Sequence, residues 1–365
     1  MSKNENVLIS DVGNEPLLGE KVSCCKKHFR TILVFFIILL IIIIGVIVIL
    51  LLKKDDDDNN DEEEEFDGPF KVLKSDKDFI KPKIYNSAEF KLVKTKNGMT
   101  VLLINDPFAQ ISHINFNIPF GSFIDTVDGI SHFSEHSIFG GSEKYPDIYA
   151  PLNLKGFKKS SINGATSVMC QVYYASVPYN YQFEKVLDIY TDAFRYPLLN
   201  ENFVKKEIQA VNSEFYMDVK SDGVIFRGVL YQFSSDKTSY HKNTSCGNNQ
   251  TLKPNESEKL AKKLKGYHMR IKNPKNIFFT LYSNQAINDS EKYIEKYLNF
   301  EMHKFSDNEI DLNDKKKLEN NILNMEKYDI FDEKLYGHGF YFNSSLKKNS
   351  IDIIFNVRNI DYKDL

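Results

Sequence analysis

Two histidines one helical turn apart are the first residues in this sequence whose spacing suggests chemistry. His132 and His136 stand in the segment His-Phe-Ser-Glu-His, directly next to Glu135. On a helix both imidazoles face one point, and Glu135 projects from a neighbouring direction, near enough to touch water held there. Zinc binds neutral imidazole nitrogen and carboxylate oxygen, and a catalytic zinc site keeps one of its four positions open. The spacing therefore predicts a zinc site that needs a third protein ligand from elsewhere.

A helix predicted over residues 202–220 supplies candidates for that ligand. Its apolar stripe consists of Val204, Ile208, Val211 and Phe215. Glu207 and Glu214 are seven residues apart on this helix, so they lie nearly above one another on one face. A carboxylate beside an apolar face is costly to bury unless it is paired or bound to metal. We expect one inner ligand and one supporting carboxylate; the alternative is a solvated helix edge.

The segments around these residues predict an α+β fold. Strands are expected at residues 90–93, 99–104, 114–118 and 168–177, and the first two flank Asn97-Gly98, a two-residue hairpin signal with positive φ at both positions. The short histidine helix should close at Gly140-Gly141, and a helix over residues 181–195 must stop before Pro197. Because strands and helices are grouped, an antiparallel-rich sheet packed by helices is favoured over a doubly wound parallel sheet.

Charge and hydropathy are distributed unevenly at the N-terminal end. Residues 31–52 carry no charge, and as a helix of about 33 Å they could cross a hydrocarbon core of about 30 Å. The run is longer than a usual signal-peptide core and begins late, so we expect a single transmembrane signal anchor. Residues 55–65 then contain nine carboxylates. The expected order is a cytosolic tail (1–30), the anchor (31–52), an acidic stalk (53–85), a zinc domain (86–319), and a linker with the start of a second domain (320–365).

The basic residues near the anchor predict its orientation. Four lie before it (Lys21, Lys26, Lys27 and Arg30), and two lie directly after it (Lys53 and Lys54), with Lys71 at the margin of the counted window. This modest excess favours a cytosolic N-terminus and an extracellular or lumenal domain. Five N-x-S/T sequons beyond the anchor are compatible with glycosylation on that side: Asn243, Asn249, Asn255, Asn288 and Asn343.

The four cysteines leave two pairs of alternatives open. Cys24 and Cys25 lie beside the anchor and are either palmitoylated or unmodified thiols. Cys170 and Cys246 would share the oxidising side, either as a disulfide or as two free thiols. Four cysteines in 365 residues exclude a disulfide-dense scaffold, and the absence of a strongly basic domain gives no support to a nucleic-acid partner.

Between about Phe90 and Leu252 the sequence resembles the insulinase (pitrilysin) family of inverted zincins, and in particular members of the insulin-degrading type. The matching residues, in order, are His132-Phe133-Ser134-Glu135-His136, Phe139, Lys144-Tyr145-Pro146, Asn163, Thr166-Ser167, Tyr173-Tyr174, Glu207 to Glu214, Gly247-Asn248 and Thr251-Leu252. The interval of 78 residues between His136 and Glu214 also fits the family's pattern.

This resemblance implies a role for each motif residue. One Zn²⁺ would be bound by His132, His136 and Glu214. Glu135 would act as general base on the water, and Glu207 would support the site without binding metal. A peptide substrate would pair as an added strand near Asn163, Gly164 and Ala165, where Gly164 replaces the alanine of the family.

The family also implies a second half. Its members hold substrate between two similar halves, and the opposite half contributes an arginine and a tyrosine for which we find no counterpart in this sequence. Two functions follow. One is a membrane-anchored zinc metalloendopeptidase that acts on peptides or small polypeptides and needs a second half, in the same chain or as a partner, for full activity. The other is a catalytically inactive homologue that binds peptides or a partner subunit.

Overall fold

The computed structural model describes residues 66, 68–148, 162–178, 183–218 and 245–324. The predicted cytosolic tail, the anchor, the first part of the stalk and residues 325–365 lie outside this part of the chain. None of the helices within the described ranges is both long enough and apolar enough to cross a membrane.

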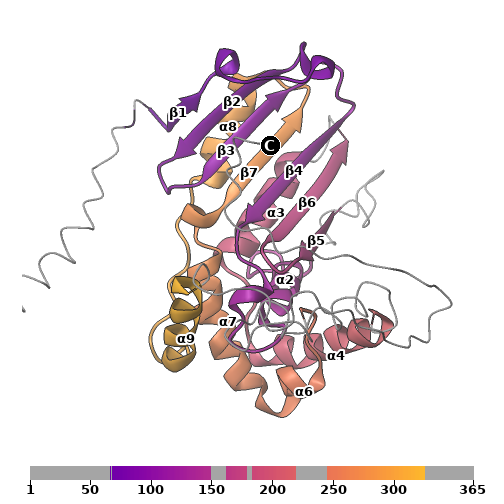
Figure 1. Cartoon of the computed structure of the whole chain (residues 1–365), viewed down its shortest axis with the longest axis vertical. Helices are drawn as coiled ribbons and strands as arrows, with labels where there is room; N and C mark the ends of the chain where they lie inside the picture. Colours follow the sequence, from indigo (N-terminus) through magenta and orange to yellow (C-terminus); the bar gives the residue numbers. More distant parts are fainter. Residues whose placement is uncertain (1–65, 67, 149–161, 179–182, 219–244, 325–365) are drawn as a thin grey trace, which may run out of the picture. The chain divides into compact units, whose positions relative to one another are not determined.

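A seven-stranded sheet is the main element of the described residues (Figure 1). Its strand order is β1-β2-β3-β7-β4-β6-β5. The strands are β1 (Phe70–Lys74), β2 (Glu89–Thr95), β3 (Thr100–Asn105), β4 (Ile111–Ile118), β5 (Ile162–Thr166), β6 (Gln171–Pro178) and β7 (Phe278–Ser283). Only the β3–β7 pair is parallel, so the predicted α+β class with an antiparallel-rich sheet agrees with the structure.

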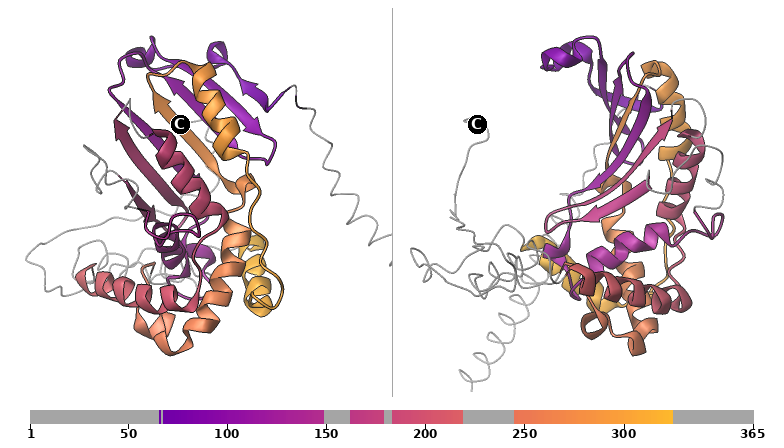
Figure 2. Two further views of the ribbon diagram at one scale, coloured as in Figure 1. Left: turned by 180° about the vertical axis from the view of Figure 1, so that it is seen from behind. Right: turned by 90° about the vertical axis from the view of Figure 1, so that its right-hand side faces the viewer.

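Two helices cover one face of this sheet, α3 (Phe183–Arg195) and α8 (Ile287–Leu298) (Figure 2). The strand residues that face them are buried, as the alternation in β4 predicted: Ile114 and Ile118 are at most 1% exposed. Between them, Phe116 packs its ring 5.0 Å from that of Phe194 on α3 and 4.7 Å from that of Phe279 on β7. This aromatic contact joins the sheet to its helical layer.

Two of the remaining helices pack against the histidine helix, α2 (Ile130–Phe139): α4 (Glu201–Asp218) and α7 (Ser257–Ile271). Helix α6 (Asn249–Leu252) packs against α4, and α9 (Leu312–Leu323) packs against α7. Short 3-10 turns are η1 (Asp76–Asp78), η2 (Lys83–Tyr85), η3 (Ser122–Ile124), η6 (Pro254–Glu256) and η7 (Pro274–Asn276). Helices α2 and α4 agree with the prediction to within two residues where they are described, and α2 ends at Gly140 as expected.

The folded domain begins earlier than we predicted. Residues up to 85 were assigned to the acidic stalk, but β1 pairs antiparallel with β2, with Phe70 opposite Thr95. The Asp76 carboxylate also accepts hydrogen bonds from the Lys81 ammonium (2.9 Å) and the Phe90 amide (2.9 Å). The sequence signal was weak because Phe70 is the only buried residue of β1. At the other boundary, α9 continues past residue 319 to Leu323.

The hairpin after β2 forms at the predicted place but not with the predicted turn. Gly98 has φ +88°, whereas Asn97 is not in the left-handed region. The Gly98 amide donates to the Thr95 carbonyl (2.9 Å) and the Thr95 amide to the Met99 carbonyl (2.9 Å), so the loop has three residues, 96–98, instead of two. The Asn97 side chain instead donates to the carbonyls of Leu298 and Phe300 (2.7 and 2.8 Å). This long-range contact decides the turn type.

The strand predicted from Val168 also begins later, at Gln171. The backbone of Ser167 and Val168 forms the turn between β5 and β6, where the Ser167 amide donates to the Cys170 carbonyl (2.8 Å). The residue pattern predicted neither β5 nor β7, and only the family resemblance implied a sheet edge near Asn163; β5 has no clear alternation because Gly164 interrupts its apolar pattern.

Candidate metal centre

A buried carboxylate holds the start of α2. Asp125 accepts hydrogen bonds from the backbone amides of Gly129 (2.9 Å) and Ser131 (3.2 Å) and from the Ser131 hydroxyl. Burial raises the pKa of Asp125 well above its usual range, although these hydrogen bonds act in the opposite direction. Gly129 itself has φ +89°, and an added Cβ there would lie 2.3 Å from the Cα of Gly247, so the chain can enter the helix this way only with glycine. This entry fixes where His132 and His136 point.

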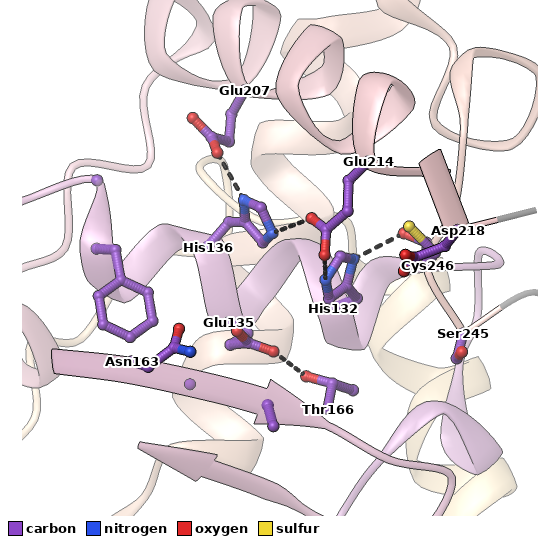
Figure 3. Close-up of a pocket in the computed structure, with 14 residues that line it drawn as sticks. His132, Glu135, His136, Asn163, Thr166, Glu207, Glu214, Asp218, Ser245 and Cys246 are labelled. Carbon is purple, nitrogen blue, oxygen red and sulfur yellow. Dashed lines mark hydrogen bonds and ion pairs between the residues drawn. The ribbon is translucent and has the colours of Figure 1, made fainter. Parts of the chain in front are cut away.

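His132, His136 and Glu214 converge on one point (Figure 3). One ligand atom from each lies within 4.8 Å of the others. The His136 Nε2 is 3.3 Å from Glu214 Oε2, and the His132 Nε2 is 3.7 Å from Glu214 Oε1. The predicted set of one carboxylate and two imidazoles is therefore brought together from two helices, α2 and α4.

The donor set fits zinc. Ligands at about 2.0–2.1 Å in a tetrahedron lie about 3.3 Å from one another, close to the nitrogen–oxygen distances found here. Both Nδ1 atoms are already engaged, that of His132 with the Cys246 carbonyl (3.0 Å) and that of His136 with Glu207 Oε1 (2.6 Å). Metal-binding histidines characteristically use their second nitrogen in this way, which leaves Nε2 free for the metal. If these three residues bound zinc, the fourth tetrahedral position would stay open, as in catalytic zinc sites.

Glu207, for which the resemblance implies a supporting role, is one of two glutamates that contact His136. Burial lowers the pKa of His136, but hydrogen bonds to Glu207 and Glu214 outweigh it and raise that pKa to about 9. The hydrogen bond from His136, together with the nearby His132, keeps the pKa of Glu214 below its usual value despite partial burial. Without metal, the two glutamates therefore favour a proton on the imidazole, and the same negative charge would favour a cation in its place.

Glu135 lies against β5 (Figure 3). Its side chain is buried, at 6% exposure, and its Oε2 accepts a hydrogen bond from the Thr166 hydroxyl (2.7 Å). A Cβ added at Gly164 would lie 2.8 Å from Oε1 of Glu135, so the glycine lets the strand approach this carboxylate closely. The carboxylate thus lies between the metal-binding helix and the strand predicted to receive substrate.

The three predicted substrate residues line the same pocket as the metal ligands, a cavity of about 650 Å³. Asn163 and Ala165 are exposed, and Gly164 between them faces α2. Strand β5 ends the sheet order, so its outer edge has no partner strand among the described residues. An open edge of this kind can pair with an extended peptide.

Sequence reasoning missed the roles of Thr166, the Cys246 carbonyl and Asp125. Thr166 was part of the family resemblance, but nothing in its spacing showed that its hydroxyl reaches Glu135. A backbone carbonyl such as that of Cys246, 114 positions away from His132, gives no sequence signal. Its hydrogen bond appears only when the chain has folded.

A buried polar network continues behind the site. The Ser131 hydroxyl contacts the Tyr267 hydroxyl (2.7 Å), which accepts from Gln171 Nε2 (2.8 Å). The Gln171 Oε1 accepts from the hydroxyl of Tyr173 (2.9 Å) and from Nζ of Lys272. Burial lowers the pKa of Lys272 well below its usual range. This network ties α2 to the β6 strand and to the end of α7.

The predicted modification sites differ in how far they are exposed to solvent. Asn255 and Asn288 are exposed, whereas Asn249 is half-buried with its Oδ1 enclosed, which makes it a poor glycosylation acceptor. Asn243, Asn343, Cys24 and Cys25 lie outside the described residues. Cys170 and Cys246 are both half-buried and form no disulfide with each other.

Comparison with known proteins finds similarity over the part of the chain that contains the candidate metal centre. Residues 100–235 match the family described as Insulinase (Peptidase family M16). An insulin-degrading enzyme homolog from Dictyostelium discoideum is 29% identical over 212 residues, which are 57% of this chain and 21% of that protein. The A-factor-processing enzyme of Saccharomyces cerevisiae is 33% identical over 181 residues (48% and 17%), and Protease 3 of Escherichia coli is 28% identical over 223 residues (60% and 22%). The chain thus spans about a fifth of the length of these relatives.

The crystal structure of pitrilysin has a similar fold, with a TM-score of 0.57 and 24% identity over 62% of this chain and 24% of that one. The ferredoxin protease FusC, solved in complex with Arabidopsis ferredoxin, gives a TM-score of 0.53 at 17% identity over 60% of this chain and 25% of that one. The sequence match includes the paired histidines on α2 and the glutamates on α4, so residues 100–235 of this chain are similar to the insulinase family, peptidase family M16.

Proposed function

We propose that this chain carries the zinc domain of a membrane-anchored metalloendopeptidase that hydrolyses peptide bonds in peptides or small polypeptides. The observation that carries the proposal is the convergence of His132 Nε2, His136 Nε2 and a Glu214 oxygen beside the buried Glu135. Zinc bound by these three residues would polarise a peptide carbonyl and make a bound water acidic near neutral pH. The relatives named above, insulin-degrading and A-factor-processing enzymes among them, support the same class of reaction.

The chain's own residues divide the remaining tasks. Glu135 takes a proton from the attacking water and passes it to the departing amine, the role of a general base that then acts as an acid. Glu207 and the Cys246 carbonyl hold the imidazoles of His136 and His132 in orientation. The open edge of β5 binds the backbone of an extended peptide, and the pocket beside Asn163 and Ala165 receives its side chains.

Two further parts of the proposal concern regions outside this domain. A second half, from a continuing chain or a partner subunit, closes the pocket from the opposite side, and the support is that the relatives are about five times longer than their match to this chain. The uncharged residues 31–52 anchor the protein in a lipid bilayer, with the peptidase domain on the extracellular or lumenal side. A loss of protein mass on glycosidase treatment that is absent in Asn288→Gln or Asn255→Gln would support the extracellular or lumenal side. Cleavage of the peptidase domain only by a protease added to the cytosolic side would contradict it.

Peptide cleavage by the zinc-loaded protein, together with its second half, tests the proposed reaction. We expect Glu135→Gln to lower kcat by about 10²- to 10⁴-fold while the bound zinc is retained, because it removes proton transfer and leaves the three ligands. Glu295→Gln, at an exposed position on α8, is the matched control and should retain full activity. Activity that survives both chelation and Glu135→Gln would rule out this mechanism.

A second function remains open because β5 could bind a peptide without any metal chemistry. An inactive homologue that captures peptides or a partner subunit would use the unpaired edge of β5 alone. It predicts peptide binding that survives chelation and shows no turnover. Turnover that depends on Glu135 would exclude it.

A further inference from the structure

The contact between Thr166 and Glu135 goes beyond the family's metal ligands and base. The Thr166 hydroxyl donates to Oε2 of Glu135 at 2.7 Å. Glu135 is 6% exposed, so Oε2 has little access to water, and this hydroxyl replaces a water molecule as its donor. Hydrogen bonds to an ionised acceptor are short and strong compared with neutral ones, so this contact restrains the carboxylate.

The backbone that carries Thr166 is held on both sides. Thr166 pairs with Gln171 at the end of β6, and the following Ser167 amide bonds to the Cys170 carbonyl (2.8 Å). From the other side, the Ser122 amide donates to the Ser167 carbonyl (3.0 Å). A β-branched side chain has few χ1 rotamers, so fixing this backbone also fixes the hydroxyl.

The two oxygens of Glu135 therefore have different surroundings. Oε2 is bonded to Thr166, whereas Oε1 lies beside Gly164, where an added Cβ would come within 2.8 Å of it. Gly164 and Thr166 are two residues apart, so both face α2 from the same side of the strand. Strand β5 thus anchors one carboxylate oxygen and leaves space next to the other.

We propose that Thr166 is a positioning residue for the general base: it anchors Oε2 so that Oε1 is the oxygen that exchanges the proton. This inference rests on the proposed peptidase function. As the water oxygen bonds to the carbonyl carbon, one O–H bond of the water breaks and an O–H bond forms at Oε1. The proton then moves to the amide nitrogen as the C–N bond breaks, which releases an amine and leaves a carboxyl group on the other product. Thr166 keeps its own proton throughout and remains a donor to Oε2.

Strand β5 would then both bind the peptide substrate and hold the general base, Glu135. Asn163 and Ala165 are the exposed residues of β5, and they alternate with Gly164 and Thr166, which face α2. A peptide that pairs with the outer edge of β5 is placed in register with the backbone that holds Glu135. The distance between the scissile carbonyl and the base is therefore set by one strand.

Kinetic comparison of Thr166→Val with Thr166→Ser tests the proposal. Valine keeps the volume and loses the donor, so we expect kcat to fall about 10- to 100-fold with KM changed by less than about twofold, as for a small misplacement of a catalytic group. Serine keeps the donor and should restore most of kcat. Thr280→Val, on β7 outside the pocket, is the matched control for the loss of a half-buried threonine hydroxyl and should behave as the wild type. Equal kcat for the valine and serine variants would overturn the proposal.

A structural measurement separates this inference from the proposed function. In crystal structures of the zinc-loaded protein, we expect the Glu135 carboxylate to rotate away from β5 in Thr166→Val and to stay in place in Thr166→Ser, with equal zinc content in both. A carboxylate that does not move in the valine variant would refute the positioning role even in a protein without turnover. Absence of turnover in the wild type would instead count against the peptidase function, and the carboxylate's position would still decide the role of Thr166.

Discussion

The Nδ1 atom of His136 lies 2.6 Å from Oε1 of Glu207, and this contact gives a candidate metal-ligand imidazole a fixed orientation. Glu207 is therefore tied to the site although it lies about two turns before Glu214 on α4 and does not share the point where Glu214 meets both histidines. The pair shows how α4 contributes twice, once with a ligand and once with its support.

Glu207→Gln should weaken zinc binding by about 10- to 100-fold, the usual effect of removing a partner that orients a metal ligand. Glutamine retains the size of the side chain but loses the negative charge that raises the basicity of His136. Zinc affinity can be measured by competition with a chromophoric chelator. Glu201→Gln on the same helix is the control, because Glu201 is exposed and bonds to Ser257 instead of the site. Unchanged affinity in Glu207→Gln would show that the contact has no role in metal binding.

Zinc binding should become tighter as pH rises toward about 9. In the metal-free protein His136 carries a proton below its raised pKa of about 9, and zinc has to displace that proton. The apparent affinity should thus rise by about tenfold per pH unit until that value. In Glu207→Gln the zinc affinity should stop rising at a lower pH, because one of the hydrogen bonds that raises the pKa of His136 is weakened. The same plateau in both proteins would contradict the assignment.

The folding stability of the metal-free domain should fall as pH rises, whereas zinc affinity should increase. Because the pKa of His136 is higher in the folded than in the unfolded state, the stabilisation that it gives is fully present below about pH 6.5 and is lost as pH rises through about 9. Thermal denaturation of the chelated protein between pH 6 and 10 measures this effect, and His136→Gln should remove it.

His268 should make the domain sensitive to acid. Burial lowers the pKa of His268 to about 3, although its Nε2 contacts the Phe194 carbonyl at 2.7 Å. The folded pKa lies below the unfolded value, so the stability is complete above about pH 6.5 and declines as pH falls toward 3. His268→Gln keeps a donor to Phe194 and should reduce this decline, whereas His303→Gln, at an exposed position, should not. Urea unfolding at several pH values would show whether the two variants differ.

Substitution of Gly121 and of Gly266 by alanine should change the free energy of unfolding in opposite directions. A Cβ at Gly121 would lie 2.1 Å from the Ser167 carbonyl oxygen, which is backbone and cannot move aside without disturbing the turn that carries Thr166. We expect Gly121→Ala to lower the free energy of unfolding by about 1–3 kcal/mol or more. At Gly266, within α7, the nearest atom would be 3.9 Å away, so Gly266→Ala should raise it by about 0.5–1 kcal/mol. Unfolding in urea measures both changes, and equal signs would contradict the close approach at Gly121.

The sequence was sufficient where the signal is local. The one-turn spacing of His132 and His136, the seven-residue spacing of Glu207 and Glu214, and the alternation of Ile114, Phe116 and Ile118 each reflect a helix or strand period. These periods predicted α2, α4, β4 and the α+β class. Family resemblance added Glu214 as a ligand and the strand near Asn163.

Tertiary structure decided the features that depend on contacts between distant segments. The turn at Asn97 differs from its local preference because its side chain reaches Leu298 and Phe300, 201 and 203 residues away. Strand β1 extends the domain into the predicted stalk because it pairs with β2, not because of its own apolar pattern. The hydroxyl of Thr166 and the carbonyl of Cys246 become partners of Glu135 and His132 only after folding. Sequence spacing records the period of one element, whereas the orientation of a base or a ligand depends on the element packed against it.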